Sequence, residues 1–118
     1  MNLIRKIPKP AKRSTRWRSS AHCNHVRSHA CVNCSSIAGI EVAHVRIGSG
    51  AGMGQKPNDW RTVSLCSECH ATQHRNGEQS FWAAYRKATG TDVEDLIEEF
   101  IKASPRRAEI AAERGFRT

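Results

Sequence analysis

The sequence predicts a small α+β domain that is held together by a structural zinc ion. Two CxxC pairs, Cys31 with Cys34 and Cys66 with Cys69, supply four thiols of the kind that bind one tetrahedral zinc ion. Two short strand-like runs lie between the pairs, so the chain must fold back on itself for the four cysteines to meet. Helical patterns then continue from the second pair to the C-terminus.

The composition indicates one small domain with a polyanionic partner. The chain has 118 residues, of which 6% are aromatic, and domains this small often need a structural metal because they bury little apolar surface. The formal net charge of +8 favours nucleic acid, and first of all DNA, as the partner. No apolar run is long enough to span a membrane or to act as a secretory signal. We therefore expect a cytoplasmic protein whose paired cysteines bind metal and whose fifth cysteine, Cys23, stays free.

Residues 1–20 are predicted to form a flexible basic arm, because they contain no acidic residue and because Pro8 and Pro10 oppose regular structure. Such an arm contacts phosphates without reading sequence, and its alternative role is that of a solubilising tail. Trp17 either stacks on a base or anchors the arm on the domain. The basic residues of the arm that we expect to contact nucleic acid are Arg13, Arg16 and Arg18.

Residues 21–90 are predicted to form the core of the domain. One or two helical turns within residues 20–30 lead into the first CxxC pair. This segment contains further metal-binding residue types, but their spacing does not reproduce a zinc finger, and we favour a polar approach segment over a second zinc site. The residues concerned are His22, Cys23, His25 and His29.

The two strands are predicted at residues 41–47 and 60–65. His44 lies on the face of the first strand opposite to its most apolar residues, and this position suits a reactive group. The Gly-rich residues 48–54 lack the ending of a phosphate-binding P-loop, and they form either a hairpin loop that lets DNA approach or a flexible linker. Lys56, just beyond this loop, is placed to contact a phosphate.

A helix is predicted from Ser67 until Gly77 stops it. His70 and His74 lie four residues apart on one face of this helix, where they can share a metal ion. His70 follows a zinc cysteine directly, so its alternative role is a hydrogen bond to the scaffold. A second helix at residues 80–89 presents an aromatic face for packing.

Residues 91–118 are predicted to form C-terminal helices. A capping box that begins at Thr91 opens a helix with one continuous apolar face and an acidic outer face, and this outer face should point away from DNA. The last helix is predicted to start at Ser104-Pro105, with Gly115 past its end.

Several of these pieces, in this order and spacing, resemble the HNH nucleases, the ββα-metal family. The resemblance covers roughly residues 23–92, and it is greatest to the phage HNH proteins of the recombination-enhancement type. Many members place an Asn where this chain has Arg61, so either Asp59 or Asn58 fills that role, or no residue does. The matching pieces are Cys31-x-x-Cys34, Ala43-His44, Met53-Gly54-Gln55-Lys56-Pro57-Asn58-Asp59, Leu65-Cys66-x-x-Cys69-His70 and His74.

The resemblance implies a ββα-metal core and hydrolysis of phosphodiester bonds, with products that bear a 5′ phosphate. His44 is then the general base, because an imidazole can take a proton from water at neutral pH. His70 and His74 hold a catalytic divalent ion, and Asp59 completes its coordination. The carboxylate favours Mg²⁺ or Mn²⁺ over Zn²⁺ at this second site. Arg46 is placed to clamp the scissile phosphate.

We therefore expect a metal-dependent endonuclease that nicks DNA or recognises a DNA structure, because the chain contains no domain that could read a long sequence. The resemblance also implies a phage setting, in the host cytosol, with a role in recombination or DNA processing beside a recombination protein. The alternative is a noncatalytic zinc-binding protein that binds DNA or assists recombination. An RNA-directed nuclease would keep the same site. The sequence indicates no oligomeric state.

Overall fold

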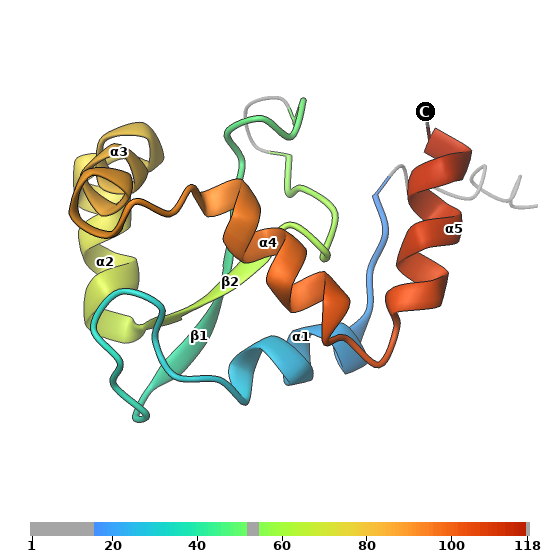
Figure 1. Ribbon diagram of the computed structural model, residues 1–118, viewed down its shortest axis with the longest axis horizontal. Coiled ribbons are helices and arrows are strands. Elements are labelled where there is room, and N and C mark those ends of the chain that lie inside the picture. The colour runs from blue at the N-terminus through green and yellow to red at the C-terminus, as the bar shows by residue number, and fades with distance from the viewer. Residues whose placement is uncertain (1–15, 52–54, 118) are drawn as a thin grey trace, which may run out of the picture.

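The structure, a computed structural model, describes residues 16–51 and 55–117, and it has the predicted α+β class. Two strands form one sheet, and five helices surround it (Figure 1). No helix of the described residues is both long and apolar enough to cross a membrane. In chain order the elements are α1 (Ser20–Arg27), β1 (Ile40–His44), β2 (Thr62–Cys66), α2 (Ser67–Asn76), α3 (Glu78–Thr89), α4 (Val93–Lys102) and α5 (Arg107–Arg117).

The sheet is an antiparallel pair in which Ile40 lies opposite Cys66 and His44 opposite Thr62. Alternation along β1 puts Ala43 on the buried face and His44 on the other face, as predicted. The strand is shorter than predicted, because beyond it the backbone N–H groups of Arg46 and Ile47 donate to the carboxylate of Glu78 instead of to a strand.

The core lies between the buried face of the sheet and the helices. Helix α4 runs across this region and packs on β2, while α2 and α3 lie together at one end of the molecule and α5 at the other (Figure 1). Because β2 is buried along its whole length, the sheet is covered on this side and open only on the side of β1 that bears His44. The least exposed core side chains include Val26, Ala43, Val45, Val63, Leu65, Ile97 and Ile110.

The start of α4 differs from the predicted capping box. The N-cap is Asp92 and not Thr91, because the Asp92 side chain accepts a hydrogen bond of 3.1 Å from the backbone N–H of Glu94. The apolar face of α4 is buried as predicted, with Ile97 only 2% exposed. Likewise α3 begins at Glu78, directly after Gly77, whose φ of 85° ends α2.

The last helix begins later than predicted. Ser104 accepts hydrogen bonds from the backbone of Arg106 and Arg107 in a turn, so the regular helix α5 starts only at Arg107. Gly115 lies within α5 and not past its end, so the prediction of a stop there was wrong.

The predicted arm of residues 1–20 lies mostly outside the described residues, but its last part belongs to the folded domain. Trp17 is 6% exposed, and its ring packs against that of Trp60 with centroids 5.7 Å apart. Its indole N–H donates to Glu109 at 2.9 Å, and its backbone pairs with Asn58 and Asp59. Of the two roles open for Trp17, the structure therefore shows the anchor.

Candidate active site and metal centre

The four paired cysteines form one cluster. Cys31 and Cys34 come from the loop before β1, and Cys66 and Cys69 come from the junction of β2 and α2. Their sulfur atoms all lie within 4.8 Å of one another, and Cys34 Sγ and Cys66 Sγ are 3.6 Å apart. A Zn–S bond of about 2.3 Å would place two sulfurs of a tetrahedral site roughly 3.8 Å apart. The cluster could therefore hold a metal ion such as zinc.

The surroundings of the cluster shift the pKa values of its thiols in different directions. Burial raises the pKa of Cys31, but backbone N–H groups of the same loop and of Cys66 outweigh it and lower this pKa to about 7. Burial raises the pKa of Cys69 to about 12, and the neighbouring thiols add to this effect although Asn33 donates to its sulfur. Four thiols so close together cannot all ionise unless a cation lies between them. The donor set therefore fits a divalent ion.

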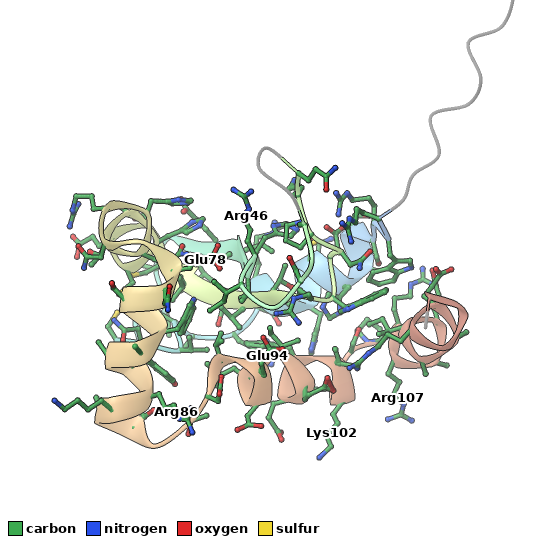
Figure 2. The ribbon with its side chains drawn as sticks, turned by 90° about the horizontal axis from the view of Figure 1, so that it is seen from above. Arg46, Glu78, Arg86, Glu94, Lys102 and Arg107 are labelled. Carbon is green, nitrogen blue, oxygen red and sulfur yellow. The ribbon has the colours of Figure 1, made fainter. Side chains whose placement is uncertain are left out.

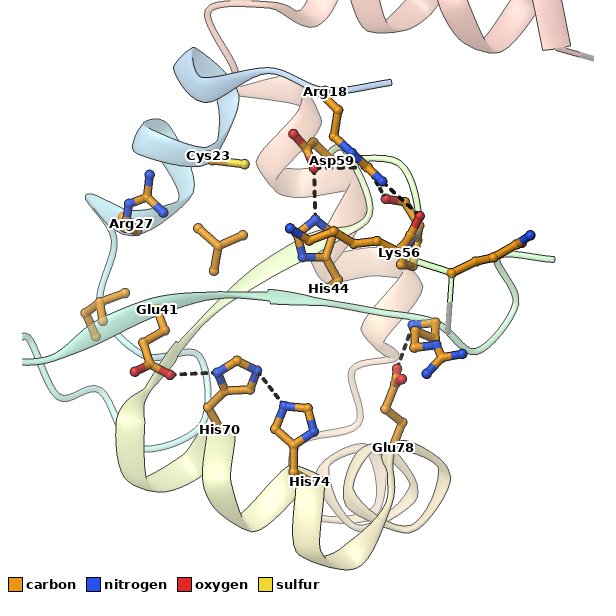
Figure 3. Close-up of a pocket in the computed structure, with 15 residues that line it drawn as sticks. Arg18, Cys23, Arg27, Glu41, His44, Lys56, Asp59, His70, His74 and Glu78 are labelled. Atoms are coloured by element: carbon orange, nitrogen blue, oxygen red, sulfur yellow. Dashed lines mark hydrogen bonds and ion pairs between the residues drawn. The ribbon is translucent and has the colours of Figure 1, made fainter. Parts of the chain in front are cut away.

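A cleft of about 690 Å³ opens over the face of β1 that bears His44 (Figure 3). Its floor is formed by alternate residues of β1 and its extension, namely Ile40, Val42, His44 and Arg46. One wall is formed by α1 and the loop before β2, with Arg18, Cys23, Arg27, Gln55, Lys56, Pro57 and Asp59. The opposite wall is formed by His70 and His74 of α2 and by Glu78 of α3.

His44 and Asp59 form a hydrogen-bonded pair in the cleft. His44 Nε2 lies 2.9 Å from Asp59 Oδ1, and the two side chains are 16% and 8% exposed. The other oxygen, Asp59 Oδ2, accepts a hydrogen bond of 2.8 Å from the backbone N–H of Ser19. Because the carboxylate can only accept, Nε2 of a neutral His44 carries the hydrogen and Nδ1 keeps a free lone pair.

Burial and neighbouring charges shift the pKa values of both His44 and Asp59. Burial lowers the pKa of His44, and this effect outweighs the hydrogen bond and charge of Asp59, which raise it. Burial alone would raise the pKa of Asp59, but the hydrogen bonds from His44 and Ser19 and the charge of Arg18 outweigh it and lower this pKa. At neutral pH the pair is therefore a neutral imidazole held by an ionised carboxylate.

His70 and His74 face each other on α2 across the cleft from His44. Their Nε2 atoms are 3.2 Å apart, and His70 Nδ1 lies 2.7 Å from Glu41 Oε1 (Figure 3). The Glu41 carboxylate fixes the hydrogen of His70 on Nδ1, which leaves its Nε2 as an acceptor beside that of His74. Two such nitrogens could share one divalent ion, with each N–metal distance about 2.1 Å.

A family model described as "Protein of unknown function (DUF968)" matches residues 5–105, which is most of the chain. The chain belongs to the DUF968 family. The DUF968 match includes all four clustered cysteines and every residue of the cleft. Comparison with curated proteins gives no match, and comparison with solved structures gives none.

In this DUF968 chain the structure does not bring Asp59 to the two histidines of α2. A metal site with three or more protein ligands needs His, Cys, Asp or Glu side chains whose ligand atoms lie close together. Among the residues that the structure describes, only the four cysteines form such a group. The expected site of His70, His74 and Asp59 is therefore not formed, because the Asp59 oxygens pair with His44 and with the backbone N–H of Ser19, away from α2. Asn58 does not line the cleft, and its side chain accepts a hydrogen bond from the backbone N–H of Trp17.

Three of the predicted phosphate-binding residues line the cleft, namely Arg18, Arg46 and Lys56. Arg18 also holds the wall together, because it donates to the carbonyls of Lys56 and Pro57 and contacts Asp59 at 3.3 Å. Arg16 is described but does not line the cleft, and Arg13 lies outside the described residues.

The sequence interpretation missed Glu41, Arg27 and Cys23, which the fold brings to the cleft. Glu41 alternates with His44 and so would lie on the face of Ala43, but it is exposed near the start of β1, where its side chain reaches His70. A lone acidic residue three positions before His44 was the available signal. Burial and then the charge of Asp59 raise the pKa of Cys23 to about 11, so this thiol stays neutral and adds no negative charge to the cleft.

Proposed function

We propose that this protein is a metal-dependent endonuclease of the HNH type that hydrolyses DNA phosphodiester bonds by nicking or in a structure-directed way. The observation that carries the proposal is one cleft with two reactive walls, a His44–Asp59 pair on one side and a His70–His74 pair on the other. A binding module would need neither pair. The phage and recombination setting is part of the proposal and rests on the resemblance to the phage HNH proteins.

His44 acts as the general base. Its Nδ1 takes a proton from the attacking water, and Asp59 holds the ring and stabilises the charge that forms on it. The lowered pKa keeps the ring unprotonated and ready at neutral pH.

His70 and His74 would hold a divalent ion, Mg²⁺ or Mn²⁺ or else Zn²⁺, with Glu41 orienting His70. When bound, this ion supplies Lewis acidity to the phosphate and to the departing 3′ oxygen. Arg46 and Lys56 neutralise phosphate charge at the rim of the cleft. The four-cysteine cluster has no place in the reaction; it holds β1, β2 and α2 in position.

The test is nicking of supercoiled plasmid by the purified protein with Mg²⁺, Mn²⁺ or Zn²⁺, together with measurement of bound zinc. We expect His44→Ala and His74→Ala each to lose about 100-fold or more in nicking rate, which is typical for loss of a general base or of a metal ligand. About one zinc per chain should remain in each variant. The matched control is His29→Ala, because His29 is an exposed histidine outside the cleft.

Full activity of both cleft variants would contradict the assignments. If no form of the protein cleaves DNA with any of these metals while DNA binding is retained, the noncatalytic accessory function is the correct one. If the protein cleaves RNA and not DNA, the assigned catalytic residues are supported, but the proposed DNA substrate is contradicted.

A further inference from the structure

The cleft extends beyond the two reactive pairs to the start of β1, and Arg27 of α1 lies at this end. Figure 3 shows Arg27 above Glu41, away from Lys56 and Glu78 at the other end. The floor between Arg27 and His44 is apolar and consists of Ile40 and Val42, both partly exposed. The proposed reaction assigns no role to this part of the cleft.

We propose that Arg27 binds a backbone phosphate within two nucleotides of the scissile phosphate, with the intervening sugars over Val42 and Ile40. This inference rests on the proposed function, because it takes the scissile phosphate to lie between His44 and the histidines of α2. It makes Arg27 a positioning residue that fixes how one DNA strand runs along β1.

The spacing of the floor supports this placement. Alternate residues of a strand lie about 7 Å apart, which is comparable with the separation of successive phosphates in a nucleic-acid strand. Val42 is one such step from His44, and Ile40 is two steps away. An extended DNA strand along β1 would therefore present its next phosphates at the end of the cleft where Arg27 lies.

Arg27 is suited to this contact by its own hydrogen bonding. It is exposed, and its Nη2 donates to Asn24 Oδ1 at 2.7 Å, which steadies the side chain on α1. A guanidinium has five N–H donors. The bond to Asn24 uses one of them, so two neighbouring N–H groups remain to bind a phosphate together. Within the part of the chain that the structure describes, no carboxylate forms an ion pair with Arg27. Its charge is thus not already neutralised.

The first experiment measures binding of a fluorescent DNA oligonucleotide without added divalent ion, as a function of salt, for the wild type and Arg27→Ala. One lost phosphate contact reduces the slope of log affinity against log salt by about 0.9. Between about 50 and 200 mM salt the wild type should therefore lose roughly threefold more affinity than Arg27→Ala. Arg27→Lys should recover most of the slope, because lysine keeps the charge. The control is Arg107→Ala, an exposed arginine on α5 outside the cleft.

The second experiment replaces single phosphates of the oligonucleotide by uncharged methylphosphonates. We expect one position, within two nucleotides of the scissile phosphate, at which the replacement weakens wild-type binding severalfold but weakens binding by Arg27→Ala no further. Equal losses in both proteins at every position, or a salt slope of Arg27→Ala equal to that of the wild type, would overturn the inference. Because both readouts are binding, failure of the inference is distinct from failure of the proposed function, which would appear as DNA binding without nicking by the wild type.

Discussion

Asp59 connects the proposed base to the N-terminal part of the chain. Oδ1 pairs with His44 and lies 3.3 Å from Arg18 Nη1, and Oδ2 accepts a hydrogen bond from the backbone N–H of Ser19. A carboxylate in this position sets the tautomer of the imidazole and favours its protonated form during the reaction. We predicted a metal ligand here, whereas the structure shows Asp59 hydrogen-bonded to His44, so under the proposed function its role is to orient that ring.

Asp59→Asn distinguishes the two roles. If Asp59 orients His44, the variant should lose about 100-fold or more in nicking rate, because an amide can hold the ring in the wrong tautomer. Raising the concentration of Mg²⁺ or Mn²⁺ should not restore this loss, whereas it should restore much of the activity if a metal ligand had been removed. Activity equal to that of the wild type would refute both roles.

His22 links α1 to the turn before α5. It is fully buried, and its Nδ1 lies 2.8 Å from Ser104 Oγ. Burial, and after it the charge of His25, lowers the pKa of His22 to about 4, although the charge of Asp59 opposes this. The folded protein therefore resists protonation of His22 in a pH range where the unfolded chain, with a pKa near 6.5, accepts the proton.

We accordingly expect stability to fall as the pH is lowered from about 6.5 to about 4, by an amount of the order of 3 kcal/mol from His22 alone. The measurement is the free energy of unfolding in denaturant at several pH values for the wild type and His22→Gln. Thiol protonation and zinc loss weaken both proteins in this range, so only the difference between them reports on His22. A difference that stays constant with pH would contradict the expectation.

At the scale of elements, the cysteine cluster joins the loop before β1 to the junction of β2 and α2. These are the elements that carry His44, His70 and His74. Ser64 at the middle of β2 strengthens the same junction, because its hydroxyl donates to the carbonyl of Ala30 at 2.7 Å. A metal ion in the cluster would therefore fix the distance between the two walls of the cleft.

Cys69→Ser should remove this constraint. We expect bound zinc to fall from about one per chain to near zero, the unfolding midpoint to fall by more than about 10 °C, and nicking to be lost. The control is Cys23→Ser, which removes the one cysteine outside the cluster and should keep the zinc. Zinc content is measured by elemental analysis and unfolding by circular dichroism. A Cys69→Ser protein that retains zinc and its midpoint would show that the four thiols do not act together.

Arg61 shows why one part of the fold could not be predicted. It occupies the place where many HNH sequences have Asn, and its side chain ties the end of β1 to α4: it donates to the carbonyls of Val45 and Ile47 and forms a two-bond ion pair with Glu94. Nothing local in the sequence indicates these partners, because Glu94 is 33 positions away. The strand alternation around His44 and the helix with His70 and His74 are local patterns, and they were predicted correctly.

At the scale of the molecule, the acidic face of α4 and the cleft lie on different sides. Figure 2 shows α4 along the side of the sheet opposite to Arg46, so the acidic outer face of α4 points away from the cleft. The expectation that this face points away from DNA stays a prediction. The prediction that the whole of residues 1–20 is a flexible arm failed at its last part for a similar reason. Trp17 and Asp59 meet only when the chain folds, and the charge pattern of residues 1–20 does not indicate this contact.

Deletions should separate the arm from the fold. Removal of residues 1–15 should leave the unfolding midpoint nearly unchanged and weaken DNA binding most at low salt, because this segment carries only basic charges. Removal of residues 1–19 also deletes Trp17 and the bonds of Arg18 and Ser19 to Asp59, and should cost about 3 kcal/mol or more of stability. Equal unfolding midpoints for the two truncated proteins would show that residues 16–19 do not support the fold.

Helix α2 is capped by one clustered cysteine, Cys66, carries a second, Cys69, in its first turn, and carries His70 and His74 in the turns that follow. The spacing between the sulfur of Cys69 and the two imidazole rings is therefore set by one helix of ten residues. One residue inserted between His70 and His74 would rotate the latter by about 100° around the helix axis while the cysteines stayed in place. An insertion there would separate the two imidazoles while the cysteine cluster stayed intact, so the helical register of α2 alone keeps the histidine pair together.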